Sequence, residues 1–221
     1  MPDVAERPDV LTLDNFIGGR WVKARASEYF DVHNPASGDV IGRTPLSTSD
    51  DVDAAVQAAA QAFPAWRNTP VNARAQFLYK FKQLCEQHFD ELARTVTTEH
   101  GKTLDEARGS VRRGIECVEV ACGAPSLMQG YGLEDISAGI DCHVFRQPIG
   151  VVAAIAPFNF PAMVPMWFLP FAIVTGNTFV LKPSEQVPLS QRKMVDLLSK
   201  CDLPPGVVVS GKLRAKFVGS T

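Results

Sequence analysis

Hydrophobic residues recur every three to four positions through much of the first half of the chain, which is the spacing of one helix face. The first such pattern starts near Ser49 and Asp50, either of which can cap a helix. It reaches Phe63, and Pro64 lies just past its end. Further helices are expected over about 72–89, 90–100 and 103–122. Together these spans predict a helical layer.

The same patterns predict which side chains each helix buries. In the second helix the expected face comprises Phe77, Phe81, Leu84 and His88. In the fourth helix it comprises Ala107, Val111, Ile115, Val118 and Cys122. Gly101 follows the third helix and is a natural stop, because glycine readily adopts the left-handed conformation that ends many helices.

Short strands are expected on both sides of this helical layer. Residues 16–22 read as strands around a Gly18-Gly19 turn, and residues 29–33 as a further strand before a turn at 34–38. After the helices, residues 131–147 alternate enough to form a hairpin with Gly139 near its turn.

The last third of the chain alternates between apolar strands and helices. Residues 150–156 form a continuous apolar run, which is typical of a strand buried on both faces of a parallel sheet. Helices over 163–175 and 188–200 are expected to alternate with strands at 178–181, 207–209 and 215–218. This rhythm predicts an α/β fold with a doubly wound parallel sheet.

The stretch between Arg146 and Lys182 contains 35 uncharged residues, long enough to span a bilayer. Its prolines stand at positions 148, 157, 161, 165 and 170, and Asn159 and Asn177 add polar groups. We therefore interpret it as strand, loop, helix and strand buried in an α/β core, with a membrane span as the alternative.

Composition and charge narrow the class of protein. Lys and Arg total 22 against 24 Asp and Glu, so no basic surface for nucleic acid or membrane is expected. Five scattered cysteines without Cys-x-x-Cys spacing indicate reduced thiols and no structural zinc. Residues 1–12 resemble neither a secretory signal nor a transit peptide, which favours a cytoplasmic protein. Residues 1–13 are expected to be a flexible tail.

Ligands of open α/β sheets bind beyond the carboxyl ends of the parallel strands. Three loops meet that condition, namely 157–161, 182–185 and 219–221. In the first, Asn159 offers an amide donor between two prolines, which suits an oxyanion site. In the second, Lys182 could meet a phosphate or ribose, and Glu185 could accept hydrogen bonds from ribose hydroxyls.

Each loop also has a structural interpretation. The 157–161 loop could be a plain turn, and the 182–185 loop could simply cap the following helix. A Gly-Ser-Thr end at 219–221 could present amides to a phosphate, but alone it is weak evidence. The Gly-x-Gly-x-x-Gly fingerprint of dinucleotide sites is absent from the sequence.

The order of several motifs resembles the aldehyde dehydrogenase superfamily over nearly the whole chain. These are Ala-Pro-Phe-Asn-Phe-Pro at 156–161, Leu-Lys-Pro-Ser-Glu at 181–185, Leu-Pro-Pro-Gly-Val at 203–207 and Phe-Val-Gly-Ser at 217–220. Within the superfamily, residues 113–119 and 123–130, with Met163-Val164-Pro165, look most like the CoA-acylating methylmalonate- and malonate-semialdehyde dehydrogenases.

The resemblance implies a fold, ligands and residue roles. It implies an N-terminal helical layer, an incomplete Rossmann-like NAD-binding sheet over 149–221 and an oligomerisation hairpin at 131–147. Asn159 would stabilise the oxyanion of a thiohemiacetal, and Arg113 would hold the substrate carboxylate. The NAD site would include Ala156, Phe158, Lys182, Glu185, Gln186 and Ser220. Coenzyme A is implied as co-substrate, and homotetramers as the assembly.

The sequence departs from the family pattern in three places. Gln186 stands where close relatives often carry arginine. Residues 208–216 are too few for the usual crossover helix, which puts the reach of Ser220 in doubt. The chain ends before the family's nucleophilic cysteine and catalytic domain. Apart from these departures, Arg113 has an alternative interpretation as a surface charge beside Glu116 and Glu119.

Two hypotheses follow from these motifs and departures. The first is NAD-dependent, CoA-acylating oxidation of methylmalonate or malonate semialdehyde, with this chain inactive alone because it lacks the nucleophile. The second is a non-catalytic fragment that binds NAD weakly or associates with full-length subunits. The sequence leaves both open.

Overall fold

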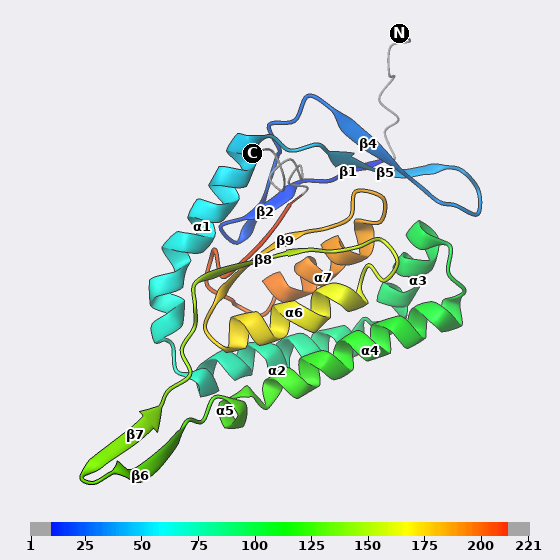
Figure 1. The fold of residues 1–221 in the computed structure, drawn as a ribbon. Helices are drawn as coiled ribbons and strands as arrows, with labels where there is room; N and C mark the ends of the chain where they lie inside the picture. Colours follow the sequence, from blue (N-terminus) through cyan, green and yellow to red (C-terminus); the bar gives the residue numbers. More distant parts are fainter. Residues whose placement is uncertain (1–9, 212–221) are drawn as a thin grey trace.

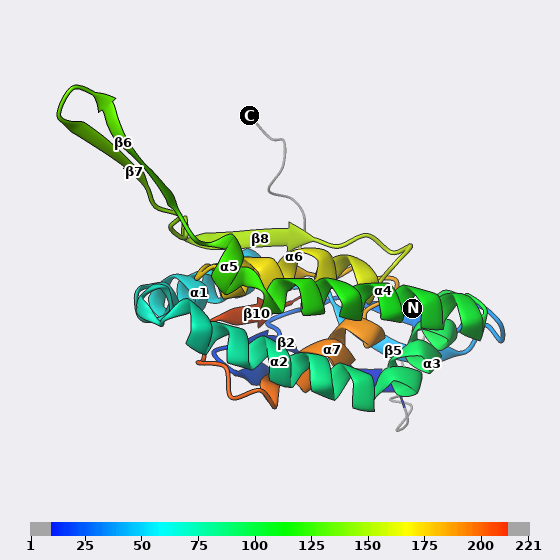
Figure 2. The same cartoon turned by 90° about the horizontal axis from the view of Figure 1, so that it is seen from below.

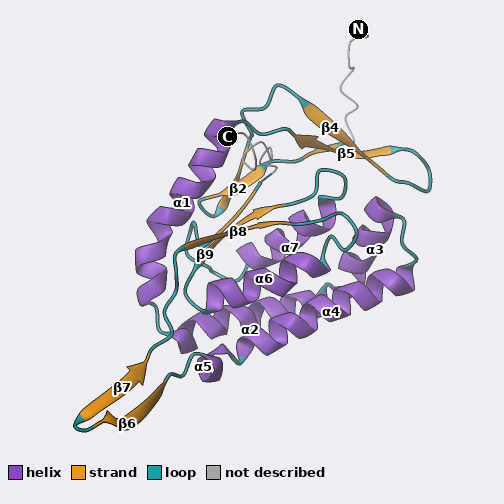
Figure 3. Ribbon diagram, in the orientation of Figure 1, coloured by secondary structure: helices purple, strands orange, loops and turns teal. Residues whose placement is uncertain are grey.

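A computed structural model describes residues 10–211 of the chain. The strand expected at 215–218, the 219–221 loop and Ser220 lie outside these residues. Within them, the mixed α/β class and the parallel sheet expected from the sequence are confirmed. The element order is given in Figure 1, and Figure 3 separates helices from strands by colour.

The central sheet has five strands in the order β3-β2-β10-β9-β8. Its parallel half comprises β8 (Val151–Ile155), β9 (Thr178–Lys182) and β10 (Val208–Ser210). The antiparallel half comprises β2 (Asn15–Ile17) and β3 (Arg20–Val22). The strands expected over 16–22 are therefore an extension of the same sheet.

Helices cover both faces of this sheet. α1 (Ser49–Asn68) packs on one face, against β9 and β10. The opposite face carries α6 (Met163–Val174), and α7 (Leu189–Ser199) follows β9 on that side. Beyond them lies an outer layer of α2 (Val71–Gln87), α3 (Phe89–His100), α4 (Leu104–Cys122) and the short α5 (Ala124–Leu127). Figure 2 shows this stacking from below.

Local sequence explains where the helices begin and end. The Thr48 amide donates to the Asp51 carboxylate 3.0 Å away, so α1 is capped one residue before the expected position. Thr103 and Glu106 form the same reciprocal cap at the start of α4. Gly101 ends α3 with φ of 83°, as the sequence predicts.

Two details of the expected helices are wrong. Pro64 lies inside α1, which continues to Asn68. The last turn is held because Trp66 is buried and its indole Nε1 donates to the Ile173 carbonyl at 2.9 Å. In α2 the buried face is rotated, so that Leu78 and Cys85 are fully buried while Phe77 and Leu84 are only partly covered.

In the part of the sheet that the structure describes, β8 is the edge strand and one of its faces is exposed, which corrects the expectation that it is buried on both faces. Val151 is 38% exposed and Ile155 61% exposed, whereas Phe179 and Leu181 of β9 are fully buried. Among the described residues β8 has a neighbouring strand on one side only. An apolar run alone does not distinguish a central strand from an edge strand.

A second, three-stranded sheet has the order β1-β5-β4, formed by β1 (Leu11–Thr12), β5 (Val40–Pro45) and β4 (Tyr29–His33). Leu11 and Thr12 pair with β5, and Leu13 is buried. Residues 11–13 are thus part of the fold, within the range expected to be a flexible tail.

The hairpin expected at 131–147 is present and stands away from the body of the molecule (Figure 2). It consists of β6 (Tyr131–Ser137) and β7 (Ile140–Val144). Gly139 has φ of 74° at the turn, and its amide donates to the Asp135 carboxylate at 3.1 Å. Every residue of β6 is exposed.

The long uncharged stretch is divided among β8, α6 and β9, and α6 has only 12 residues. Within residues 10–211, no helix combines the length and apolar character that a bilayer crossing requires.

Candidate functional site

The loops after β8 and β9 lie side by side at one edge of the sheet. Ile155 is in register with Lys182, and the Ala156 amide donates to the Lys182 carbonyl at 2.9 Å. We call residues 157–162 and 183–188 the two rim loops. Figure 1 shows both on the same side of the molecule, where the strands end. The structure therefore brings together two of the three loops expected to bind a ligand.

The first rim loop presents accessible polar and aromatic groups on a fixed base. Asn159 is exposed and Phe158 is 55% exposed, while Ala156 and Pro161 at the two ends are buried. The ring of Phe160 lies under the ammonium of Lys102, whose Nζ is 3.5 Å from the ring centroid. An amide held between buried anchors is suited to donate a hydrogen bond to a ligand.

Two residues expected to contact a ribose, Lys182 at the end of β9 and Glu185 in the second rim loop, are paired with each other. Lys182 Nζ lies 2.9 Å from the Glu185 carboxylate, and their side chains are 15% and 45% exposed. The Lys182 side chain is thus mostly covered at the strand end, and the Glu185 carboxylate is the more accessible partner. Gln186 is exposed, and its backbone amide donates to the Ser184 hydroxyl at 3.3 Å.

The start of α7 is capped by a residue that the sequence did not indicate. Glu99, at the end of α3, accepts hydrogen bonds from the amides of Leu189 and Ser190 at 2.5 and 3.0 Å. The first two amides of α7 are therefore capped by a carboxylate from a distant part of the sequence and not by the loop before the helix. Neither Glu99 nor Lys102 could be recognised by spacing, because their partners lie 90 and 58 positions away in the chain.

Arg113 lies on α4, on the side that faces α6, the helix that follows the first rim loop. Its guanidinium is 3.0 Å from the Glu116 carboxylate, and the side chain is 72% exposed. It opens onto a cavity of about 300 Å³ between α4 and α6. The cavity is lined by Arg113, Glu116, Cys117, Val120, Trp167 and Phe171. A cation beside aromatic walls suits a small organic anion.

The pKa values of several thiols are raised by burial. Burial raises the pKa of Cys201 to about 12 and also raises those of Cys85, Cys117 and Cys122. A thiol with a raised pKa is protonated at neutral pH, and a protonated thiol is a poor nucleophile. These four cysteines therefore lack the chemistry of an activated nucleophile.

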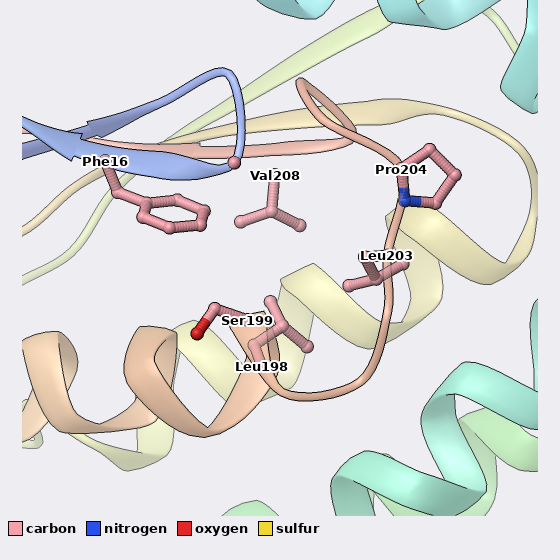
Figure 4. A pocket seen from close by; sticks show the side chains of 7 residues that line it. Phe16, Leu198, Ser199, Leu203, Pro204 and Val208 are labelled. Atoms are coloured by element: carbon pink, nitrogen blue, oxygen red, sulfur yellow. The ribbon is translucent and has the colours of Figure 1, made fainter.

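A second cavity lies beside the antiparallel half of the sheet (Figure 4). It is bounded by Phe16 of β2, Val208 of β10 and Leu203 after α7, and its volume is about 30 Å³. That volume is on the scale of roughly one water molecule, so the cavity is too small for a nucleotide. In residues 10–211, His, Cys, Asp and Glu form no cluster suited to a metal ion.

Comparison with known proteins matches most of the chain to one family. The model described as the aldehyde dehydrogenase family matches residues 21–217. A malonate-semialdehyde dehydrogenase of Geobacillus kaustophilus (strain HTA426) is 51% identical over 91% of this chain, and the match covers 41% of that relative. One of Bacillus pumilus (strain SAFR-032) is 52% identical over the same share of this chain and 42% of its own length. The chain thus spans about two fifths of these relatives.

Solved structures agree with the sequence match. A methylmalonate-semialdehyde dehydrogenase from Oceanimonas doudoroffii has a TM-score of 0.88 and is 46% identical, covering 91% of this chain and 41% of that one. A Sinorhizobium meliloti 1021 protein, assigned to the same activity and determined in complex with NAD, has a TM-score of 0.88 at 39% identity over the same shares.

Proposed function

Because this chain belongs to the aldehyde dehydrogenase family, we propose that its rim loops bind NAD in a protein that oxidises malonate or methylmalonate semialdehyde to an acyl-CoA. The observation that carries the proposal is the adjacency of Ala156 and Lys182 at the carboxyl ends of two parallel strands. That edge is where open α/β sheets bind nucleotides. The named activities of the relatives and the NAD bound in one of them support it.

In this proposal the second rim loop holds the adenosine ribose. The Glu185 carboxylate can accept hydrogen bonds from ribose hydroxyls, and the Lys182 ammonium, 2.9 Å away, orients that carboxylate. The exposed Phe158 ring offers an apolar surface, the buried Ala156 anchors the start of its loop, and the exposed Gln186 can donate or accept. Ser220, also assigned to this site, lies outside the described residues. Bound NAD would supply the hydride acceptor.

The first rim loop would serve the acyl chemistry. Asn159 is exposed next to the proposed NAD site, and its amide can donate to an oxygen that gains negative charge when a thiolate attacks an aldehyde. The buried ends of its loop limit the reorganisation that such a donor would need. Coenzyme A as the acyl acceptor is part of the proposal because residues 113–119 and 123–130 resemble those of CoA-acylating semialdehyde dehydrogenases.

Arg113 would bind the carboxylate of the substrate. Both semialdehydes carry one, and a guanidinium can hold it with two parallel hydrogen bonds. The cavity beside Arg113 has a volume of about 300 Å³, and Trp167 and Phe171 form apolar walls. Glu116 would have to release Arg113 from its present ion pair at 3.0 Å. Because that pair is well exposed, its replacement by a substrate costs little.

A second function, association with further subunits, is favoured by the hairpin. Tyr131, Leu133, Ile136 and Ile140 are each more than half exposed on two strands that stand away from the core. Exposed apolar groups of this kind mark protein contacts. We include in the proposal that the hairpin joins copies of this chain, or full-length relatives, into an oligomer.

Calorimetric titration of the purified chain with NAD tests the cofactor site. We expect binding that weakens about tenfold in Lys182→Met and Glu185→Gln, since each variant removes one charged hydrogen-bond partner. Lys193→Met is the matched control, because Lys193 pairs with Glu91 on the outer helices. Equal weakening in all three variants, or no NAD binding by the unmodified chain, would refute the site.

An assay of NADH formation with methylmalonate semialdehyde and coenzyme A tests the chemistry. We expect NAD binding without turnover, because the buried thiols with raised pKa values are protonated. Cys117 lines the cavity of Arg113, so Cys117→Ser is the control for any turnover that is seen. Thiol-dependent activity lost in that variant would contradict the assignment of Cys117 as unreactive.

A further inference from the structure

Residues 99–102, at the end of α3, contact the first rim loop and the first turn of α7, which directly follows the second rim loop. Glu99 is 3% exposed, and its two carboxylate oxygens accept hydrogen bonds from the Leu189 and Ser190 amides. These amides begin α7 and close the second rim loop. A helix leaves its first amides without partners, and a carboxylate placed there also meets the positive end of the helix dipole. Glu99 therefore fixes the point at which this loop ends.

Three residues later, the same segment reaches the first rim loop. Lys102 Nζ lies 3.5 Å from the centroid of the Phe160 ring, next to the exposed Asn159. A cation at that distance from a ring face is attracted by the electrons of the ring. Lys102 is half-buried, which lowers the pKa of its ammonium and strengthens the attraction to the ring because fewer water molecules compete for the charge.

The turn between the two contacts is set by backbone geometry. Gly101 has φ of 83°, in the left-handed region, and a Cβ built there would lie 2.8 Å from Pro35 Cγ. Only glycine fits both conditions, so the chain leaves α3 in one direction. Glu99 and Lys102 are then held at a fixed separation, one facing each rim loop.

We propose that Glu99 and Lys102 are positioning residues that set the spacing of the two rim loops, and so the width of the NAD site. The identity of the ligand as NAD rests on the proposed function, but the spacing of the loops is a property of this chain alone. Asn159 would be held through Phe160, and Lys182 with Glu185 through the start of α7. Neither positioning residue needs to contact the ligand.

Hydrogen exchange of the full chain, read by mass spectrometry, tests the spacing without any ligand. Glu99→Gln should make the amides of 184–190 exchange about tenfold faster, because a charged acceptor of two hydrogen bonds is lost. Lys102→Met should make the amides of 158–163 exchange about threefold faster, and Lys102→Arg should restore them, because arginine keeps the cation above the ring. Each variant should loosen its own loop more than the other.

Two variants serve as matched controls. Asp51→Asn removes another buried carboxylate that caps a helix, since Asp51 accepts the Thr48 amide at the start of α1. Arg112→Met removes another cation above a ring, since Arg112 lies 4.6 Å from the Phe89 centroid. Both should lower the unfolding midpoint without faster exchange in either rim loop. If exchange in the rim loops rises equally in the control and test variants, Glu99 and Lys102 only stabilise the fold as a whole and do not position the loops.

NAD titration of the same variants separates this proposal from the proposed function. If the unmodified chain binds NAD, Glu99→Gln and Lys102→Met should each weaken binding about three- to tenfold, and Lys102→Arg should restore it. If the unmodified chain does not bind NAD, the proposed function fails while the exchange data still decide the spacing. Unchanged exchange in both rim loops overturns the positioning role, whatever NAD does. If Glu99→Gln does not fold, the pair Lys102→Met and Lys102→Arg still decides it.

Discussion

β9 and the β6–β7 hairpin both carry apolar side chains, but those of β9 are covered by helices and those of the hairpin are exposed to solvent. In β9, Phe179 and Leu181 are fully buried in the core on the α6 side of the sheet, and Val180 is buried against α1 on the other side. In the hairpin, Leu133 and Ile140 are 58% and 56% exposed. A lone two-stranded hairpin is marginally stable in water, whereas a covered central strand is stabilised by the core. The rim loops begin where β8 and β9 end, so the proposed NAD site depends on the central sheet and not on the hairpin.

The largest expected effect comes from truncating the same side chain in the two regions. Phe179→Ala should lower the free energy of unfolding by about 3–5 kcal/mol, because it leaves a cavity in a packed core. Phe145→Ala, just beyond β7, should change it by less than about 0.5 kcal/mol, since that ring is 80% exposed. Urea denaturation of both variants measures the difference. Similar losses would mean that the hairpin end is not independent of the core.

A smaller loss is expected at Arg74, which ties helices together beneath the covered region. Its guanidinium donates to the carbonyls of Val174 at 2.7 Å and Arg67 at 3.3 Å, and also to that of Thr69. Arg74→Met should lower the free energy of unfolding by about 2–3 kcal/mol, because several buried carbonyls lose their donor. Arg67→Met, which removes only an exposed side chain, is the control by the same denaturation. A change below 1 kcal/mol at Arg74 would contradict its role.

The pH dependence of stability should also distinguish the covered region. Burial raises the pKa of Cys201 to about 12, and it raises that of Cys85 further, so both thiols bind protons more tightly in the folded chain than in the unfolded one. The stability that they contribute is complete below the unfolded thiol pKa near 9 and is lost as pH rises above it. By pH 10 each thiol should contribute about 1 kcal/mol less. In Cys85→Ala/Cys201→Ala this part of the decline between pH 9 and 11 should vanish; an unchanged decline would place its source elsewhere.

Substitutions in the hairpin should have the smallest effect on stability, but they should weaken the association of subunits. Leu133→Ser/Ile140→Ser should change the free energy of unfolding of the monomer by less than about 0.5 kcal/mol, because both side chains are already in water. If the hairpin joins subunits, the double variant should sediment as a smaller species than the unmodified chain. Thr95→Ser/Thr98→Ser on α3 is the control. Identical sedimentation of all three would remove the hairpin from the proposed assembly.

Local patterns were sufficient for much of the fold and for part of the site. The buried stripe of α4 and the stop at Gly101 follow from helical spacing and from glycine's backbone freedom, and both are confirmed. The prediction that ligands would gather where β8 and β9 end also needed only the rule for open sheets, and the structure places these loops together. The roles of Asn159, Lys182 and Arg113 remain proposals.

Other features could not be read from local patterns. β8 and β9 are similarly apolar, yet one lies at the edge and the other at the centre of the described sheet. Pro64 reads as a helix stop, but the burial of Trp66 carries α1 past it. Lys182 and Glu185 each read as a ribose contact, and the structure pairs them.

By itself the sequence determined the identity and order of most elements, though not of β1, β5 and α5, because spacing, caps and turn residues act within a few positions of each other. Only the tertiary structure decided which faces are covered, and it alone brought Glu99 to the start of α7 and Lys102 to Phe160. Those contacts join residues 90 and 58 positions apart, and their energy exists only once the chain between them has folded. No local pattern carries that information.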